Sequence, residues 1–256
     1  MKKKIWLQEM TWEEVRDITK TVDIALIPIG STEQHGLALP LGTDSYAAIG
    51  LAEDVAEKTG TVIAPPIWYG DSSHHMAFSG TITLRPETVI ELIKDVSESL
   101  IRHGFRKIIV INGHRGANLS ALDIAMRSVK EKTGAYAAVV DPFHIAVDIV
   151  PKIRETEGYH AEEIEASHML YLKPELVHLD RAVKEMPKLS KYMVLDPFTK
   201  AVRIDIKFGA EDEAKMTKSG AMGDPRKGTK EKGEKYHQAM VNVLVDFIEN
   251  IKASKT

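Results

Sequence analysis

The chain has 256 residues, with 34 lysines and arginines, 37 aspartates and glutamates, and no cysteine. This length can bury a large core, and the lack of cysteine excludes a disulfide scaffold and thiolate metal sites. With a net charge of -3 and no basic cluster beyond Lys2–Lys4, nucleic acid is not an expected partner, because phosphate binding needs a concentrated cationic face.

The N-terminal segment indicates a protein of the cytoplasm. Glutamate and tryptophan residues of IWLQEMTWEEV interrupt any apolar stretch after the first lysines, so we expect no signal peptide. Apolar runs fall short of the roughly 18 residues that a membrane span needs. A membrane is therefore not an expected partner either.

Apolar runs alternate with helical periodicity along most of the chain, which is typical of a mostly parallel sheet with crossover helices. The predicted strands are near-continuously apolar, as strands covered on both faces are, at Asp23–Gly30, Thr61–Trp68, Arg106–Gly113 and Ala135–Pro142. The predicted helices are Thr11–Thr19, Ser45–Lys58, Pro86–His103, Leu119–Lys132, Ala161–Leu172 and Lys230–Lys252. We expect an α/β fold, one three-layer α/β/α domain over residues 1–256.

Two further segments have less regular patterns. The threonine-rich alternation of Phe78–Leu84 predicts a short strand or hairpin arm. The region Lys173–Gly228 is irregular and contains the strand-like Val202–Phe208. We expect this region to be a lid over a site or an assembly arm.

Polar side chains follow two of the predicted strands. Glu33 and His35 come after the first strand, and Asn112 and His114 after the third. Ligands bind at this edge of open parallel sheets, and Asp44 stands near it at the start of the next predicted helix. Each residue alone has an ordinary structural explanation, such as a helix cap for Asp44. Together they indicate a metal site.

The loop after the second strand carries Asp71, His74 and His75 at the same edge. Adjacent side chains in a regular element face opposite ways, so we expect at most one of the two histidines to act. His144, after the fourth strand, is expected on the surface.

The segment YHAEEIEASHMLYL supplies a second histidine and carboxylate pair. His160 is expected just before the helix, and Glu165 on its buried face, where a carboxylate needs a cation. Glu162 and Glu163 favour the helix dipole in the first turn and are expected to be solvated. Glu165 is therefore the predicted fifth metal ligand.

Taken together, these motifs resemble the creatininase (creatinine amidohydrolase) family. The shared motifs, in order, are GSTEQHG with LGTD, HHMAFSGTITL, NGH followed by Asn118, HAEEIEAS and GDPRKGTKEKGE. The resemblance implies a three-layer α/β/α domain with two divalent metal ions. It also implies hydrolysis of C–N bonds in cyclic or linear amides, and a homohexamer.

The resemblance also implies roles for single residues. The implied metal ligands are Glu33, His35, Asp44 and His114, with Asp44 bridging the two ions. His160 matches a proton-transfer histidine, and Glu165 the carboxylate that follows it. Creatinine-cleaving members have a glutamate two residues after the NGH histidine, where Gly116 stands here. This departure disfavours creatinine and leaves the fifth ligand to Glu165 or a water.

The expected chemistry is hydrolysis by a metal-activated water. Two ions that share a carboxylate, about 3.5–4 Å apart, can lower the pKa of a bound water and polarise a carbonyl. Imidazole and carboxylate ligands suit zinc, which we expect first, and also manganese or iron. His160, or Glu165 as a base, is expected to move the proton to the leaving nitrogen. Backbone donors of Asn112–Gly116 are expected to face the oxyanion.

Substrate and class stay open on the sequence alone. The expected substrate contacts are His75, Arg115 and Asn118; Arg115 suits an anionic group and is equally compatible with a plain surface position. The alternatives are a formamide hydrolase acting on a ribosylated pyrimidine, a lactone- or peptide-processing relative, and a non-enzymatic metal-binding scaffold. The segment GSTEQHG lacks the G-x-G-x-x-G fingerprint of a dinucleotide-binding loop, which argues against a nucleotide-binding protein. The sequence contains no G-x-S-x-G motif, which argues against a serine hydrolase.

Overall fold

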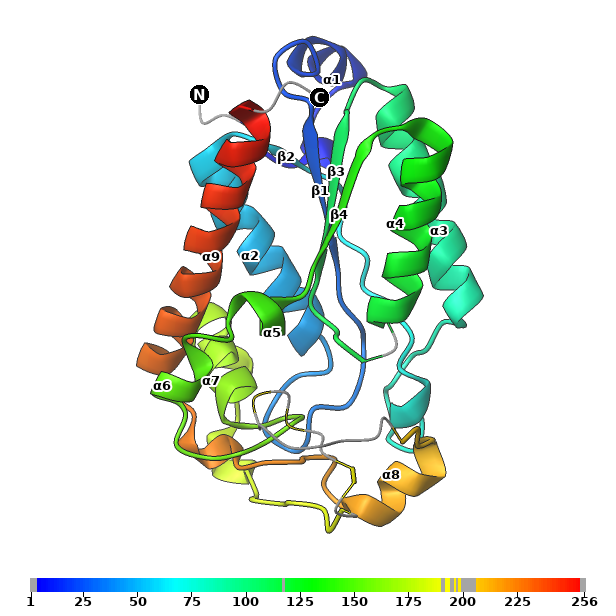
Figure 1. Cartoon of the computed structure of the whole chain (residues 1–256). Coiled ribbons are helices and arrows are strands. Elements are labelled where there is room, and N and C mark those ends of the chain that lie inside the picture. Colours follow the sequence, from blue (N-terminus) through cyan, green and yellow to red (C-terminus); the bar gives the residue numbers. More distant parts are fainter. Residues whose placement is uncertain are drawn as a thin grey trace.

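The computed structural model describes residues 4–116, 118–189, 192–193, 196, 198 and 206–253. Within this part, a sheet of four parallel strands has the order β2-β1-β3-β4 (Figure 1). The strands are β1 (Ile24–Ile29), β2 (Val62–Ile63), β3 (Lys107–Asn112) and β4 (Tyr136–Val140). The helices are α1 (Trp12–Ile18), α2 (Thr43–Thr59), α3 (Pro86–Arg102), α4 (Asn118–Thr133), α5 (Pro142–Ile145), α6 (Val150–Ile153), α7 (Glu163–Leu172), α8 (Ala210–Met216) and α9 (Lys230–Ala253).

Helices cover both faces of the sheet, as predicted (Figure 1). Ile24 and Leu26 of β1 belong to a core shared with α2 and α9. The alternate residues Ala25 and Ile27 belong to a core shared with α3 and α4. Because both faces are buried, the strands need no polar alternation, which explains their continuous apolar sequence. The predicted three-layer α/β/α fold is confirmed.

The second strand is much shorter than the predicted Thr61–Trp68. β2 pairs with β1 at Val62 and Ile63 and then ends. Pro65 and Pro66 follow, and because proline has no backbone N–H, it cannot continue the ladder. The chain still runs beside β1, since Ile67 forms a single bridge with Ile29.

Two helices, α2 and α7, begin at residues other than those predicted. α2 begins at Thr43 rather than Ser45, which places Asp44 within its first turn. α7 begins at Glu163 rather than Ala161, because Ala161 has a φ of 47° and Glu162 caps the helix. The short helices α5, α6 and α8 have no counterpart in the prediction, since so few residues show no clear period.

The threonine-rich segment joins the loops after β1 and β2 through isolated bridges. Phe78–Leu84 forms no regular strand, but its Ile82 and Thr83 bridge to Thr32 and Gly70. The predicted strand Val202–Phe208 falls largely outside the described residues, and residues 206–208 have no regular structure.

In the part of the chain that is described, no helix combines the length and apolarity needed to span a membrane.

Glu185 ties part of the late region to the turn before Gly220. Its carboxylate accepts hydrogen bonds from the backbone N–H groups of Lys218 (2.7 Å) and Ser219 (2.9 Å) and from the Ser219 hydroxyl (2.6 Å). Burial opposes ionisation, but these hydrogen bonds outweigh it and lower the pKa of Glu185 from 4.5 to about 2. The late region therefore contains a carboxylate that is stabilised in its ionised form.

This shift predicts a pH-dependent contribution to stability. A folded pKa below the unfolded value makes the contribution fully present above about pH 4.5, and it is lost as the pH falls through about 2. We expect Glu185→Gln to lower the free energy of unfolding at pH 7, and the difference from wild type to shrink by pH 3. Urea unfolding at both pH values measures it, with the exposed Glu175→Gln as control. A difference that is equal at the two pH values would contradict this assignment.

Candidate metal centre

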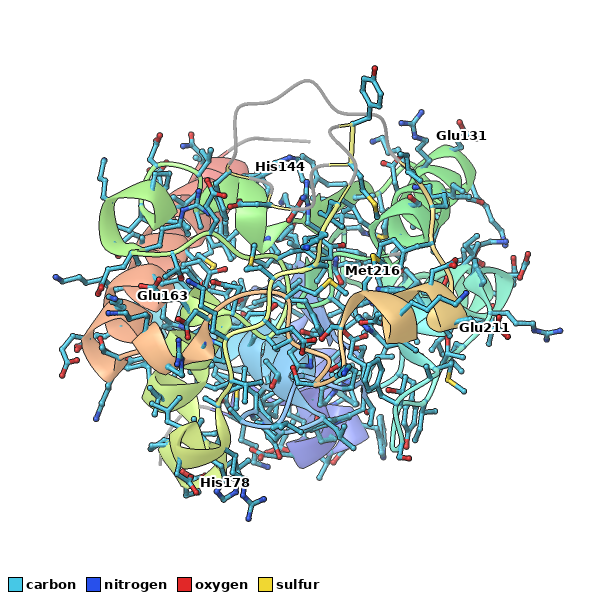
Figure 2. The ribbon with its side chains drawn as sticks, turned by 90° about the horizontal axis from the view of Figure 1, so that it is seen from below. Glu131, His144, Glu163, His178, Glu211 and Met216 are labelled. Carbon is cyan, nitrogen blue, oxygen red and sulfur yellow. The ribbon has the colours of Figure 1, made fainter. Side chains whose placement is uncertain are left out.

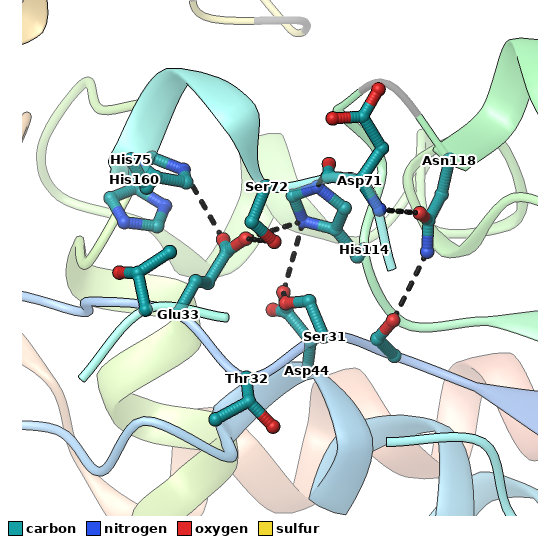
Figure 3. Close-up of polar contacts among 12 residues, drawn as sticks. Ser31, Thr32, Glu33, Asp44, Asp71, Ser72, His75, His114, Asn118 and His160 are labelled. Atoms are coloured by element: carbon teal, nitrogen blue, oxygen red, sulfur yellow. Dashed lines mark hydrogen bonds and ion pairs between the residues drawn. The ribbon is translucent and has the colours of Figure 1, made fainter. Parts of the chain in front are cut away.

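Four of the predicted ligands meet at the carboxyl ends of the strands, and Figure 3 shows three of them, Glu33, Asp44 and His114. Glu33 and His35 lie on the loop after β1, Asp44 lies in the first turn of α2, and His114 follows β3. His114 Nδ1 is 3.0 Å from Asp44 Oδ2 and 3.2 Å from Glu33 Oε2. His35 Nε2 is 3.1 Å from Asp44 Oδ1. All four side chains are buried, so the expected convergence at this sheet edge is present.

The carboxylates of Asp44 and Glu33 are held in place by a close backbone contact and by hydrogen bonds from two serine hydroxyls. A Cβ at Gly113 would overlap the carbonyl oxygen of Asp44, so a glycine lets the end of β3 lie directly against α2. Ser31 donates a 2.6 Å hydrogen bond to Asp44 Oδ2, and Ser72 donates one of 2.6 Å to Glu33 Oε2. Each carboxylate is thereby held in one orientation.

The electrostatics of the cluster are those of buried carboxylates that require positive charge. Burial disfavours a charged His35, but the Asp44 carboxylate outweighs it and raises the pKa of His35 to about 10. Burial likewise opposes the shift at Glu33, yet His114 and His75 hold its pKa well below the usual range. The carboxylates therefore favour positive charge on the neighbouring imidazoles. A divalent cation would supply the same charge.

The donor set fits such a cation. Ligand atoms of Glu33, His35 and Asp44 lie within 4.8 Å of one another. His35 Nε2 is buried and faces Asp44 Oδ1 at 3.1 Å and Glu165 Oε2 at 3.9 Å without a well-directed hydrogen bond to either, an arrangement that a shared cation would satisfy. Imidazole and carboxylate donors without thiolates suit zinc, manganese or iron.

The second histidine and carboxylate pair reaches the same cluster. Glu165 Oε2 lies 3.9 Å from His35 Nε2 and accepts a 2.6 Å hydrogen bond from the backbone N–H of Ala161. Burial, assisted by the nearby Asp44 charge, raises the pKa of Glu165 to about 7. His160 precedes α7, as expected, and its Nε2 lies 2.8 Å from the carbonyl oxygen of Gln34.

Comparison with known proteins identifies the family. The sequence model of the creatininase family, described as creatinine amidohydrolase, matches residues 8–248. The chain belongs to the creatininase family. Its members are metal-dependent hydrolases that act on C–N bonds of small molecules, so the predicted family and enzyme class are confirmed.

Individual relatives of this creatininase-family protein carry different names. It is 35% identical to 3-dehydro-scyllo-inosose hydrolase of Thermotoga maritima, over 72% of this chain and 61% of that protein. It is 28% identical to creatinine amidohydrolase of Pseudomonas putida, over 97% of each chain. It is 30% identical to the mycofactocin precursor peptide peptidase of Mycolicibacterium smegmatis, over 91% and 87%.

Solved creatininase structures share the whole fold. A creatinine amidohydrolase structure superimposes with a TM-score of 0.81 at 25% identity, over 99% of this chain and all of that one. A creatininase described as a Zn-Zn type gives 0.79 at 25% identity, and one described as Mn gives 0.78 at 26%; each alignment covers 98% of this chain and all of the other. Divalent metal binding is thus a property of these relatives.

The predicted substrate contacts of this family member take three different positions. His75 is buried between Glu33 and Glu213. Arg115 lines the cavity above the cluster and pairs with Asp141, with Nε 3.2 Å from Oδ2. Asn118 is buried, and its side-chain oxygen accepts a 2.8 Å hydrogen bond from the backbone N–H of Asp71.

His74 lines the same cavity as His75, because both lie in a 3₁₀ turn at Ser73–His75 and not in a strand. That at most one of the two acts stays a prediction. The expectation about Glu162 and Glu163 is wrong. Glu162 and Glu163 are buried rather than solvated. Glu163 accepts hydrogen bonds from the backbone N–H groups of Glu155 and Thr156, which removes the need for water.

Sequence reasoning missed several side chains that complete the site. They are Ser31, Gln34, Ser72, Tyr159 and Glu213. Gln34 lies within the GSTEQHG motif, so its position next to Glu33 was a usable signal. Glu213 had none, because it lies 179 residues after Gln34, outside every motif.

Proposed function

We propose that this protein is a divalent-metal-dependent amidohydrolase that cleaves a C–N bond of a small cyclic or linear amide. The ligands would be Glu33, His35, Asp44 and His114, with Glu165 as the fifth. The supporting observation is the buried cluster of carboxylates around His35 Nε2, which faces Asp44 at 3.1 Å without a well-directed hydrogen bond. Family membership supports the reaction class.

The residues around the cluster are suited to proton transfer. When bound, the metals supply a Lewis acid and activate water at neutral pH. Glu165, whose pKa is about 7, can accept and release a proton near neutrality. Burial and the neighbouring His75 lower the pKa of His160 well below its usual range, so its ring is neutral. Its Nε2–H then donates to the Gln34 carbonyl, which leaves Nδ1 as an acceptor.

The substrate is proposed at the level of its chemistry. Arg115 at the cavity supports an amide with an anionic group, and the absence of a glutamate at Gly116 argues against creatinine itself. A formamide on a ribosylated pyrimidine carries such a group when its ribose is phosphorylated, and this is the alternative that Arg115 favours. Lactone and peptide substrates complete the range to be tested.

Metal identity, assembly and location are further parts of the proposal. Zinc is proposed first, because imidazole and carboxylate ligands suit it, with manganese and iron as alternatives. About two ions per chain are expected if Asp44 bridges them. A homohexamer is proposed on the family resemblance, and a location in the cytoplasm is proposed with it.

Elemental analysis of the purified protein tests the proposal. We expect about two divalent ions per chain after loading with zinc, manganese or iron. The loaded protein is then assayed on creatinine, on formamides with and without a phosphate, on a lactone and on a short peptide. Hydrolysis of an amide that requires metal supports the proposal. Failure to retain any of the three metals would overturn it, and retained metal without hydrolysis of any of these substrates would favour the metal-binding scaffold.

A further inference from the structure

Glu213 is a buried carboxylate that reaches the candidate metal centre from the late region of the chain. It lies on α8, which lies in front of the sheet in the view from below, with Glu211 and Met216 toward its two ends (Figure 2). Its side chain is fully buried, which is unfavourable for a carboxylate unless it is hydrogen-bonded. Glu213 can therefore be buried here only because other side chains hydrogen-bond to its carboxylate.

Those partners are His75 and Gln34. His75 Nδ1 lies 2.7 Å from one Glu213 oxygen and 2.9 Å from the other. Gln34 Nε2 donates a 3.0 Å hydrogen bond to the same carboxylate. Because a carboxylate oxygen accepts hydrogen bonds, the proton between His75 and Glu213 lies on Nδ1.

The other edge of the His75 ring faces the metal centre. With Nδ1 directed at Glu213, Nε2 lies 3.2 Å from Glu33 Oε1 (Figure 3). Glu213, His75 and Glu33 thus form a continuous chain of buried contacts. Ser72 holds the other oxygen of Glu33, so both oxygens of this proposed ligand have a fixed partner.

Gln34 joins the segment around α8 to the loop after β1, which carries Glu33 and His35. Its Nε2 donates to Gly220 O at 3.1 Å as well as to Glu213, and its Oε1 accepts from Gly36 N–H at 2.9 Å. Gly220 has a φ of +89°, and a Cβ there would overlap the Gln34 amide. The segment around α8 therefore has one close-fitting position on this loop.

We propose that Glu213 is a positioning residue of the metal centre. It holds His75 with Nε2 toward Glu33, and so fixes the carboxylate of a metal ligand. This inference rests on the proposed function, because it concerns a ligand of the proposed site. Partners of this kind around metal ligands typically change metal affinity by about 10–100-fold.

The first test compares zinc affinity in three variants of the full-length protein. Chelator competition gives the Kd of wild type, Glu213→Ala, Glu213→Gln and Glu211→Gln. We expect Glu213→Ala to weaken zinc binding about 10–100-fold, and Glu213→Gln to weaken it less, since an amide oxygen can still accept from Nδ1. Glu211→Gln, an exposed change on the same helix, is expected to leave the Kd unchanged.

The second test observes His75 directly in the metal-free protein. Nuclear magnetic resonance of ¹⁵N-histidine-labelled protein should show a slowly exchanging, downfield ring N–H for His75, assigned by its absence in His75→Asn. We expect this signal to vanish in Glu213→Ala and to persist, shifted, in Glu213→Gln. A loss of folding stability alone would not move this signal in the isosteric variant.

The outcomes separate the two proposals. If wild type binds zinc and both Glu213 variants bind it equally well, Glu213 is not a positioning residue, whatever the site does. The same holds if the His75 signal is unchanged in Glu213→Ala. If wild type binds no metal, the proposed function fails and with it the role at a metal centre, while the resonance still reports whether Glu213 orients His75.

Discussion

Asp44→Ala is expected to lose bound metal and to lower kcat by about a thousandfold or more, because several kcal/mol of transition-state stabilisation depend on the metals. Asp44 contacts both His35, at 3.1 Å, and His114, at 3.0 Å. A carboxylate between two imidazoles is the group that can bridge two ions. If Asp44 is the shared ligand of the proposed site, its removal would affect both ions, whereas the loss of a terminal ligand would weaken one.

Elemental analysis and steady-state kinetics on a hydrolysed amide measure this effect. Asp44→Asn keeps the side-chain volume and separates the loss of charge from the loss of packing. Glu57→Ala, an exposed change on the same helix, is the control and should retain metal and activity. Full metal content in folded Asp44→Ala would show that Asp44 is not a shared ligand.

Gly113→Ala is expected to destabilise the fold by about 3 kcal/mol or more, and to weaken metal binding with it. A Cβ at this position would overlap the backbone carbonyl of Asp44, where β3 ends against α2. Neither segment can move freely, because β3 is a central strand and α2 lies over the sheet. The strain is therefore transmitted to the Asp44 carboxylate.

Gly134→Ala is the matched control for the loss of a glycine. Gly134 has a φ of +73° but no atom within 4 Å of an added Cβ, so the substitution adds conformational strain without a clash. We expect a loss of about 1–2 kcal/mol there, with metal binding unchanged. Urea unfolding and zinc affinity are compared for both variants. Equal losses of stability, with zinc affinity retained in both, would contradict the proposed close contact.

Local patterns in the sequence determined the layers of this protein and the edge where its site lies. Continuous apolar runs identified β1, β3 and β4 to within two residues at each end, because strands buried on both faces have few polar positions. The motif after β1 placed Glu33 and His35 together, since they are adjacent to one strand end. His114 and Asp44 followed from the parallel topology, which brings strand ends to one edge.

Contacts between distant segments decided the rest. The shortness of β2 depends on which residues pair with β1, and the burial of Glu162 and Glu163 depends on partners supplied by the fold. Glu213 belongs to the site because α8 lies against the loop after β1, which no local period encodes. Side-chain periodicity reports which face of an element is buried, whereas hydrogen bonds between residues 179 apart form only when the chain has folded.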